Sequence, residues 1–442
     1  MTHGGLVERI WARDAGVWTG GDEAQWLGWL DEPSRRLERV DELLSLAQAA
    51  GEPDDVVLLG MGGSSLAPEV LRRSFGVERF HVLDTTHPRA VRALADRLDP
   101  ARTLFVVSSK SGGTIETRSH ADFFAAGGGR FVAVTDPGSD LEAWAVTRGD
   151  AVVHGEPTIG GRYSALSPFG LVPAALMGLD VRRLLGRAQE MREACMLADG
   201  NPGLELGLEL GQGWRDGRDK VVLDAPGGFA LWCEQLLAES TGKQGKGLVP
   251  IVEPYDGPDA QHPEARLEDA YELGQEFFRW EFATAVAGHV LGIDPFDQPD
   301  VQAAKDKTKE VLAAGEEPSL APEGDLDALL SEARDGDYVF VQAFVDPAHE
   351  ARLRPLLDRL RASGRPVSWG LGPRYLHSTG QLHKGGPDTG IFVQVVDELG
   401  DELPIPGRDL GFRRLFAAQA AGDFGALQER GRRIVRLRLE DV

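Results

Sequence analysis

Two short apolar segments of this chain each lead directly into a loop rich in glycine and hydroxyl side chains. The first, residues 56–59, is Val-Val-Leu-Leu and opens into Gly-Met-Gly-Gly-Ser-Ser at 60–65. The second, residues 103–107, is Thr-Leu-Phe-Val-Val and opens into Ser-Ser-Lys-Ser-Gly-Gly-Thr at 108–114. A helical pattern follows each loop. The order strand, glycine loop, helix is typical of parallel α/β sheets that bind phosphate, so we expect an α/β domain with an anion site here.

Phosphate binding requires several hydrogen-bond donors together with a positive group and the N-terminus of a helix. Both loops contain hydroxyl side chains and glycines that let backbone amides approach an anion closely. The second loop adds a lysine. The residues predicted to bind phosphate are Gly63, Ser64, Ser109, Lys110, Ser111 and Thr114.

A dinucleotide fingerprint is the competing interpretation of the first loop. Gly60 and Gly62 fit its first two glycines, and Asp84 ends the next apolar segment at about the spacing expected for a ribose contact. Ser65 occupies the place of the third glycine, however, and the 108–114 loop has no role in binding a pyrophosphate. Neither loop has the Gly-Lys-Ser/Thr ending of a triphosphate loop. A monophosphate site is therefore the preferred interpretation.

An acidic residue at the end of an apolar helical pattern is the candidate for proton transfer. Residues 229–238 form that pattern, and Ser-Thr-Gly at 240–242 ends it, so that Glu239 lies at the helix end beside Lys243. A carboxylate held there can act as a general base. The alternative is a solvated glutamate in the last turn of a helix.

Five segments resemble, in the same order, motifs of the phosphoglucose isomerase family, whose members are built from sugar isomerase (SIS) domains. They are residues 60–64 and 109–114, similar to the phosphate loops; 159–164, with Gly-Gly-Arg; 239–243, with the glutamate; and 295–305, with Gln and Lys. An ordered set of motifs is far more specific than one glycine loop. The sequences of these motifs are most similar to the isomerase half of fused transaldolase and glucose-6-phosphate isomerase proteins. No transaldolase half is expected in this chain.

The resemblance implies reversible isomerisation of glucose 6-phosphate and fructose 6-phosphate through a cis-enediol or enediolate, a step of glycolysis and gluconeogenesis. Such an intramolecular oxidoreductase needs no metal and no cofactor. Glu239 would move the proton, Arg162 would stabilise the enediolate, and Lys305 would assist opening of the sugar ring. The further substrate contacts that the resemblance implies come from Gly161, Gln235, Gln298 and His383.

The ring-opening histidine occupies an unusual place in the chain. Most family members carry it between the glutamate and the lysine, where this chain has only His262 and His289. A downstream segment, 372–386, contains His377 and His383 and resembles the family's histidine helix. His377 is the preferred catalytic residue. For each histidine the alternative is an imidazole satisfied by a nearby carbonyl at a helix cap.

Two other functions remain open at this stage. A phosphoglucose and phosphomannose isomerase of dual specificity would differ only in how its pocket treats the epimer at C2. A non-catalytic SIS-domain sensor of sugar phosphates would need the two phosphate loops but not Glu239 or Arg162.

Length and patterning predict more than one hydrophobic core, because 442 residues with 42% hydrophobic content exceed the size of one ordinary domain. We expect an α/β protein with two SIS-type domains, each a parallel-sheet α/β sandwich. The predicted division is a helical N-terminal arm at 1–50, a first SIS domain with the phosphate loops at 51–195, and a second with a C-terminal α/β lobe at 196–442. Further strands are expected at 220–224, 338–345, 366–370, 391–396 and 432–439.

The formal net charge of −23 argues against nucleic acid and anionic membranes as partners, since both select basic surfaces. A sugar phosphate must then be attracted locally, by Lys110, Arg162, Lys243 and Lys305. The two cysteines are expected to be buried thiols. With no signal peptide pattern and no apolar run long enough to cross a bilayer, a cytoplasmic protein is expected. The resemblance implies a homodimer.

Overall fold

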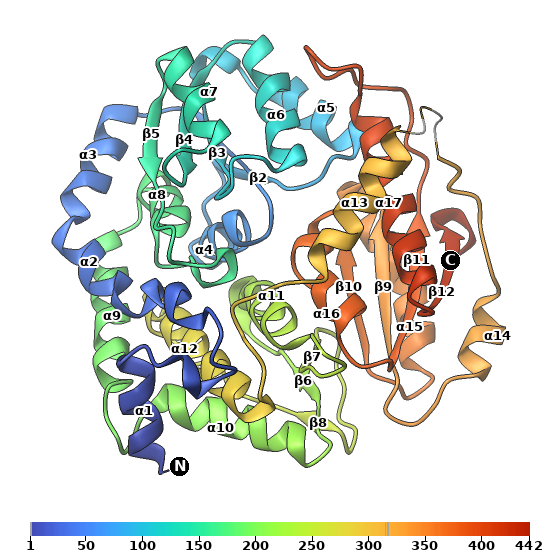
Figure 1. Cartoon of the computed structure of the whole chain (residues 1–442). Helices are drawn as coiled ribbons and strands as arrows, with labels where there is room; N and C mark the ends of the chain where they lie inside the picture. The colour runs from blue at the N-terminus through green and yellow to red at the C-terminus, as the bar shows by residue number, and fades with distance from the viewer. Residues whose placement is uncertain (1, 314, 316–317) are drawn as a thin grey trace.

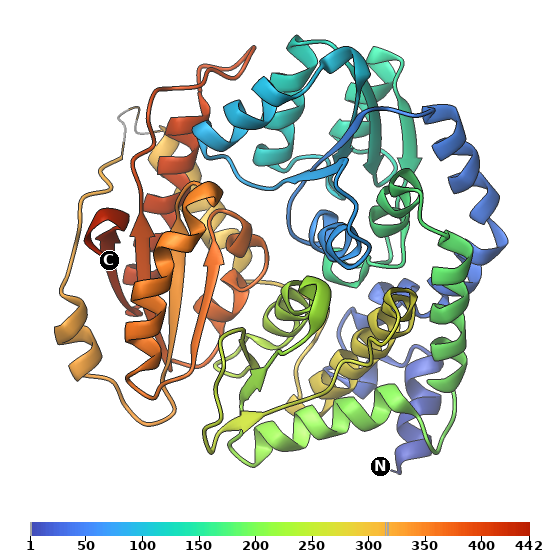
Figure 2. The ribbon, with the colours of Figure 1, turned by 180° about the vertical axis from the view of Figure 1, so that it is seen from behind.

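The computed structural model describes residues 2–313, 315 and 318–442, and their side chains except those at 303–305. Three separate parts are visible from the front and from behind: one sheet at the top, a second sheet at one side, and helices below (Figures 1 and 2). Both large sheets are parallel and have helices packed around them, so the predicted α/β fold is confirmed. Among the described helices, none has the length and apolar character needed to cross a membrane.

The first sheet contains the two predicted phosphate-loop strands at its centre. Its strand order is β2-β1-β3-β4-β5, and every neighbouring pair is parallel. The strands are β1 (Asp55–Gly60), β2 (Phe80–Leu83), β3 (Thr103–Ser108), β4 (Arg130–Thr135) and β5 (Ala151–His154). The helices that connect them are α4 (Leu66–Ser74), α5 (Pro88–Arg97), α6 (Ile115–Ala126) and α7 (Asp140–Arg148).

Apolar side chains on both faces of β1 explain why this strand is central. Val56 and Leu58 pack into one hydrophobic cluster. Val57 and Leu59 pack into another, on the opposite face. Successive side chains of a strand point to opposite faces, so a run of four apolar residues fits only a strand covered on both sides.

The second sheet is built entirely from the C-terminal part of the chain and has the order β10-β9-β11-β12, again all parallel. Its strands are β9 (Tyr338–Phe344), β10 (Val367–Leu371), β11 (Gly390–Val396) and β12 (Arg433–Arg438). Associated with it are a 3-10 helix, η9 (Pro347–Leu353), and the helices α14 (Leu326–Ser331), α15 (Arg354–Arg361), α16 (Gly380–Gly385) and α17 (Phe412–Glu429). The predicted strands at 338–345, 366–370, 391–396 and 432–439 correspond to these four.

A third, three-stranded sheet and a group of long helices occupy the lower part of the molecule. The strands are β6 (Lys220–Val222), β7 (Val249–Ile251) and β8 (Ala260–Gln261), in the order β7-β6-β8. The helices are α8 (Pro168–Met177), α9 (Val181–Ala194), α10 (Pro202–Arg215), α11 (Phe229–Thr241) and α12 (Leu273–Leu291). Nearly every residue of α12 is buried, and α10 packs along it. Cys195 and Cys233 are buried, as expected.

The N-terminal arm is helical, as predicted, but it is divided into short pieces. It contains α1 (His3–Trp11), α2 (Glu32–Glu38) and α3 (Val40–Ala50), and it runs up one side of the molecule (Figure 1). Residues 26–30, expected to be helical, lie in two 3-10 turns. Arg39, at φ −113° and ψ 14°, separates α2 from α3.

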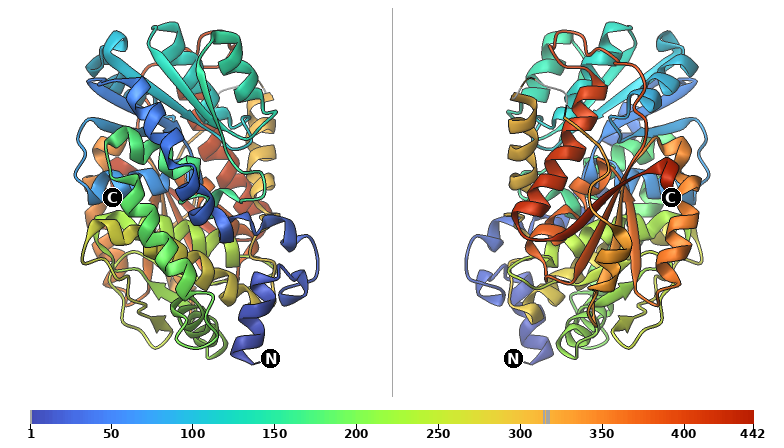
Figure 3. Two further views of the ribbon diagram at one scale, coloured as in Figure 1. Left: turned by 90° about the vertical axis from the view of Figure 1, so that its left-hand side faces the viewer. Right: turned by 90° about the vertical axis from the view of Figure 1, so that its right-hand side faces the viewer.

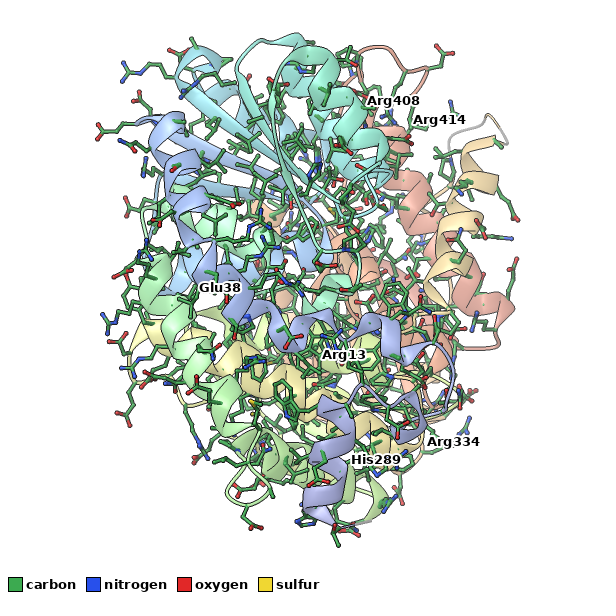
Figure 4. All side chains as sticks on the ribbon, turned by 60° about the vertical axis from the view of Figure 1, so that its left-hand side comes forward. Arg13, Glu38, His289, Arg334, Arg408 and Arg414 are labelled. Carbon is green, nitrogen blue, oxygen red and sulfur yellow. The ribbon has the colours of Figure 1, made fainter. Side chains whose placement is uncertain are left out.

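Contacts between the two large sheets pass through α13 (Val301–Ala313) and α17, which lie side by side (Figure 3). Arg408, just before α17, donates to Asp122 Oδ2 on α6 at 2.8 and 2.9 Å. Arg414 Nη2 donates to the Leu312 carbonyl at the end of α13, 2.9 Å away. Figure 4 labels both arginines: Arg408 ties the C-terminal segment to α6 of the first sheet, and Arg414 ties it to α13.

Candidate active site

Glu239 lies in the last turn of α11, and its side chain is held by two neighbours. It is 7% exposed. Gln235, one turn earlier on the same helix, donates its Nε2 to Glu239 Oε2 at 3.0 Å. Arg162 Nη1 lies 3.3 Å from Glu239 Oε1. Both carboxylate oxygens are therefore fixed in direction, which a solvated glutamate at a helix end would not need.

Arg162 connects the Glu239 helix to the segment before α13. It is 2% exposed and belongs to a short 3-10 turn, η6 (Gly161–Tyr163). Its Nε donates to Ser240 Oγ at 2.8 Å, and its Nη2 donates to the carbonyls of Pro295 and Asp297 at 2.7 and 2.9 Å. Its Nη1 also donates to Gln298 Oε1 at 3.2 Å. A guanidinium is suited to this role, because its planar donors bind several acceptors at fixed angles.

Lys243 binds the same segment from the other side. Its Nζ donates to the carbonyls of Asp294 and Asp297, at 2.8 and 2.6 Å, and pairs with the Asp297 carboxylate. Burial, together with the nearby charge of Arg162, lowers the pKa of Lys243 to about 8. The two cations thus fix the turn that carries Gln298 against the end of α11.

The first phosphate loop touches the Arg162 turn through backbone atoms alone. The loop forms a short 3-10 turn, Gly62–Ser64, directly after β1. A Cβ atom added at Gly63 would lie 2.1 Å from the Gly161 carbonyl oxygen, so only glycine permits this contact. The Gly62 backbone, at φ +55°, passes close to the His377 carbonyl in the same way. The predicted Gly63 and Gly161 positions are therefore adjacent.

The second phosphate loop connects β3 to the N-terminus of α6. Ser109 Oγ donates to Thr114 Oγ1 at 3.1 Å, and Thr114 is the residue that precedes the helix. Ser111 is exposed at the tip of the loop. A cavity of about 250 Å³ opens beside it, lined in part by Ser111, Thr114 and His377. The loop hydroxyls and the predicted histidine thus face one space.

His377 lies between the phosphate loops and the helix that carries Glu239. Its Nε2 is 2.8 Å from Glu116 Oε1, and its carbonyl accepts a hydrogen bond from Gln235 Nε2 at 2.7 Å. Gln419 Nε2, from α17, donates to the same Glu116 oxygen at 2.7 Å. Thr86 Oγ1 donates in turn to Gln419 Oε1 at 2.6 Å. The imidazole is therefore oriented by a carboxylate that is itself held in place.

His383 is placed differently from the prediction that it binds substrate. Its side chain is 1% exposed and packs against the rings of Phe340, Tyr375 and Phe392. Neither ring nitrogen has a hydrogen-bond partner among the described residues. Burial lowers the pKa of His383 well below its usual range, and the charges of Lys384 and Arg432 act in the same direction. The residue is a neutral part of the hydrophobic core, so the structure corrects this prediction.

Lys110 also differs from its predicted position. Its ammonium pairs with Asp136 and donates to the carbonyls of Glu156 and Pro157, at 3.3 and 3.4 Å. These contacts hold the 108–114 loop to the neighbouring loops, and they engage the Lys110 ammonium with protein partners. Lys305 belongs to α13, but its side chain lies outside the described residues.

The two histidines between Glu239 and Lys305 are both remote from this arrangement. His289, labelled in Figure 4, contacts the Val17 carbonyl where α12 meets the N-terminal arm. His262 is exposed, and its Nε2 lies 3.5 Å from Asp256. Their surroundings agree with the preference for His377.

Three further residues of the site were not predicted from the sequence. Glu116 is the second residue of α6 and lies two residues after Thr114 of the predicted anion site, so its position could have indicated a role in the site. Ser240 directly follows Glu239. Gln419 lies in a long C-terminal helix with no motif around it, and only the tertiary structure shows its contact with Glu116.

Comparison with known proteins places these observations in a family. Residues 38–200 match the family model described as phosphoglucose isomerase. A glucose-6-phosphate isomerase from Thermus thermophilus is 34% identical over 283 residues, which cover 60% of this chain and 68% of that protein. One from Rubrobacter xylanophilus is 28% identical over 389 residues, covering 63% and 87% of the two chains. One from Cyanothece is 37% identical over 213 residues, covering 43% of this chain and 40% of that protein.

Two solved structures share the fold. The crystal structure of a glucose-6-phosphate isomerase from Chlamydia trachomatis aligns with a TM-score of 0.53 at 20% identity, over 70% of this chain and 78% of that one. The crystal structure of a hypothetical protein from Thermus thermophilus aligns with a TM-score of 0.51 at 23% identity, over 99% and 84% of the two chains. These likenesses support the same architecture. The identity and coverage of the Thermus thermophilus relative are decisive: the chain belongs to the phosphoglucose isomerase family.

Proposed function

We propose that this chain is a glucose-6-phosphate isomerase, which interconverts glucose 6-phosphate and fructose 6-phosphate. The observation that carries the proposal is the ion pair between Glu239 Oε1 and Arg162 Nη1, at 3.3 Å, in a buried site next to hydroxyl-rich loops. A base beside a fixed cation is what an enediolate mechanism requires. The relatives named glucose-6-phosphate isomerase support the choice of substrate.

Glu239 is proposed to move a single proton between two neighbouring carbons. In the forward direction its carboxylate removes the proton from C2 of the open-chain aldose, and the electron pair of that C–H bond forms the C1–C2 double bond of the enediolate. The protonated Glu239 then returns the proton to C1, while the proton of the O2 hydroxyl passes to O1, so that a carbonyl is left at C2 and a hydroxyl at C1. Negative charge develops on the sugar oxygens during the first step, and Arg162 would stabilise it by charge-assisted hydrogen bonds.

Ring opening precedes this step and is assigned to His377. A cyclic sugar must lose the proton of its anomeric hydroxyl while its ring oxygen gains one. The contact between His377 Nε2 and Glu116 Oε1, at 2.8 Å, would hold the imidazole in one orientation while it transfers these protons. Lys305 keeps its predicted part in ring opening as a proposal, and Gln298 is proposed to orient the substrate hydroxyls.

The phosphate group is proposed to bind at Ser64, Ser109, Ser111 and Thr114, with the N-terminus of α6 supplying further donors. This group does not react, so its binding energy can position the reacting carbons relative to Glu239. Lys110 is left out of this set, because it already pairs with Asp136.

The Glu239→Gln variant tests the proposal, because it keeps the hydrogen bond from Gln235 but removes the base. We expect kcat to fall by about 1,000-fold or more, while binding of fructose 6-phosphate changes little. Glu209→Gln, an exposed substitution on α10, is the matched control. Turnover in Glu239→Gln equal to that of the control would refute the assignment of the base. Assaying mannose 6-phosphate in parallel decides between single and dual specificity.

Domain division and assembly are part of the same proposal. We place the helical arm at 1–50, the first SIS domain at 51–195 and the second, with its C-terminal lobe, at 196–442. All five strands of the first sheet lie within 55–154, which supports the first boundary. The protein is further proposed to be a homodimer related to the isomerase half of fused transaldolase proteins. Sedimentation that finds only monomer would contradict the assembly.

A further inference from the structure

The two large sheets share the same strand order over four strands. In the first, β1 lies between β2 and β3, and β4 follows β3; in the second, β9 lies between β10 and β11, and β12 follows β11. The chain reverses direction across the sheet between β1 and β3, and again between β9 and β11. Ligands of open parallel sheets bind beyond the carboxyl ends of the strands at this reversal point. In the first sheet this is where both phosphate loops lie.

The corresponding place in the second sheet contains a larger cavity. Its volume is about 670 Å³, compared with about 250 Å³ for the cavity beside His377, and the two have no lining residue in common. It begins at the ends of β11 and β12, and His349, from η9 after β9, forms part of its wall. Cavities of roughly 300–1,000 Å³ are typical of small-molecule sites.

Four arginines from four different elements converge on this cavity. They are Arg89 of α5, Arg352 of η9, Arg413 of α17 and Arg438 of β12. The amino-acid composition does not predict such a cluster of arginines, because the chain carries 70 acidic residues and only 47 lysines and arginines. The clustering therefore creates a local reversal of the charge of the protein.

Acidic groups in the same wall neutralise only part of this charge. Asp397 pairs with Arg89 Nη2 at 2.9 Å and with His349 Nδ1 at 2.7 Å. Arg89 Nε keeps no hydrogen-bond partner among the described side chains and lies 4.0 Å from Asp346 Oδ2.

The remaining charges lie around the rim. Glu440 pairs with Arg438 at 3.3 Å, and Glu398 is exposed. Arg352 is exposed and forms no hydrogen bond or ion pair within the described part of the chain. The Arg352 guanidinium therefore offers donors that an anion can accept.

We propose that this cavity is a second anion site, at which the chain binds a small phosphorylated molecule through Arg89 and Arg352. Planar guanidinium groups bind phosphate oxygens in pairs, and two of them in the wall of one cavity can hold a phosphate group. The site is separate from the proposed isomerase site, since it lies at the other sheet and uses none of its residues.

The number of anions bound per chain tests the proposal. Inorganic phosphate is titrated into the full chain at constant ionic strength, with calorimetry as the readout. We expect two equivalents for the unchanged protein. The triple variant Ser109→Ala, Ser111→Ala, Thr114→Ala removes donors of the first site and should retain one equivalent. Adding Arg352→Glu to that variant should weaken the remaining binding at least tenfold, which corresponds to about 1.4 kcal/mol.

Two controls separate binding from folding and from general charge effects. Arg359→Glu on α15 makes the same charge change at an exposed residue outside the cavity, and it should leave the second equivalent intact. Circular dichroism checks that each variant is folded. A triple variant that binds no phosphate, or an Arg352→Glu addition that leaves its binding unchanged, would overturn the proposal. Isomerase assays of the unchanged protein are independent of both outcomes, so failure of the second site is distinguishable from failure of the proposed function.

Discussion

The two parallel sheets have the same strand order, but their reversal points carry opposite kinds of side chains. At the first reversal point the loops carry glycines and small hydroxyl side chains. The cations Arg162 and Lys243 come from other segments of the chain and are buried. Arg162 there is 2% exposed and donates to four oxygen atoms besides its contact with Glu239. The second carries its cations on adjacent elements, and Arg352 among them is exposed.

This difference shows that strand order fixes where a ligand can bind but not what chemistry occurs there. A reacting centre needs a cation that does not move, because preorganised charge costs no rearrangement in the transition state. A binding site for an anion has no such requirement. The buried Arg162 therefore supports the proposed catalysis at the first sheet, and the exposed Arg352 and Arg438 support the proposed binding at the second.

The largest expected effect concerns Arg162. It tests whether a rigidly held arginine distinguishes the reversal point of the first sheet from that of the second. Arg162→Lys keeps the charge but loses the planar set of donors that connects Ser240, Pro295 and Gln298. We expect kcat for glucose 6-phosphate to fall by about 100–1,000-fold. Arg359→Lys, an exposed change beside the second sheet, is the control and should have no effect. A lysine variant with more than a tenth of the original kcat would break the comparison.

Most of the fold was predictable because the central strands have apolar residues on both faces. Residues 56–59 and 103–107 fit only strands covered on both sides, and the structure gives β1 and β3 there. The short strands β5, β7 and β8 were missed. Only three residues of β7 pair with β6, and a segment this short has no periodicity of its own. The break between α2 and α3 at Arg39 could not be predicted from the sequence either, since no glycine or proline ends α2.

The candidate site was predictable where a short sequence motif contains a residue that reaches the site. The segments around Gly63, Arg162 and Glu239 are brought into direct contact. Lys110 and His383 show the limit of this reasoning, because a motif gives the residue type but not the direction of the side chain. Lys110 has an acidic neighbour, Asp136, from a different strand, and His383 points into an aromatic core.

The next prediction compares the two reversal points through one helix. α17 carries Arg413 at the second reversal point and Gln419 at the first. Gln419 holds Glu116, which contacts His377. Gln419→Leu removes that hydrogen bond to a carboxylate, and we expect kcat to fall by about tenfold with little change in KM. The dependence of kcat on pH should shift as well, because Glu116 then orients His377 less firmly.

Gln428→Leu, near the end of the same helix, is the matched control for a polar-to-apolar change. Within the described residues the Gln428 side chain donates to Glu323 at the surface, far from Glu116 and His377 in the bonding network, so neither kcat nor the pH profile should move. If Gln419→Leu and Gln428→Leu behave alike, Gln419 is a packing residue and the contact with Glu116 has no part in positioning His377.

The last prediction concerns stability and not turnover, and it separates two carboxylates of α11 that face the two sheets. Glu239 contacts Arg162, whereas Glu234 lies in a cavity bordered by Trp369 and Leu371 of β10, and its Oε1 has no hydrogen-bond partner among the described residues. Burial raises the pKa of Glu234 to about 8 from 4.5, against the opposing charge of Arg374. The folded state then binds more protons than the unfolded state between these values. Stability from this residue is complete below pH 4.5 and is lost as the pH rises toward 8, by roughly 1 kcal/mol per pH unit.

Glu234→Gln removes this ionisation and should therefore flatten the pH dependence of stability. Urea denaturation at pH 5, 6.5 and 8 gives the free energy of unfolding for each protein. Relative to the variant, the unchanged protein should lose stability at each step upward. Glu38→Gln, at an exposed glutamate on α2 (Figure 4), should follow the unchanged protein. Parallel profiles for Glu234→Gln and the unchanged protein would mean that Glu234 is ionised in the folded state. In that case Arg374 would compensate its charge as Arg162 is positioned to do for Glu239, and the two faces of α11 would not differ.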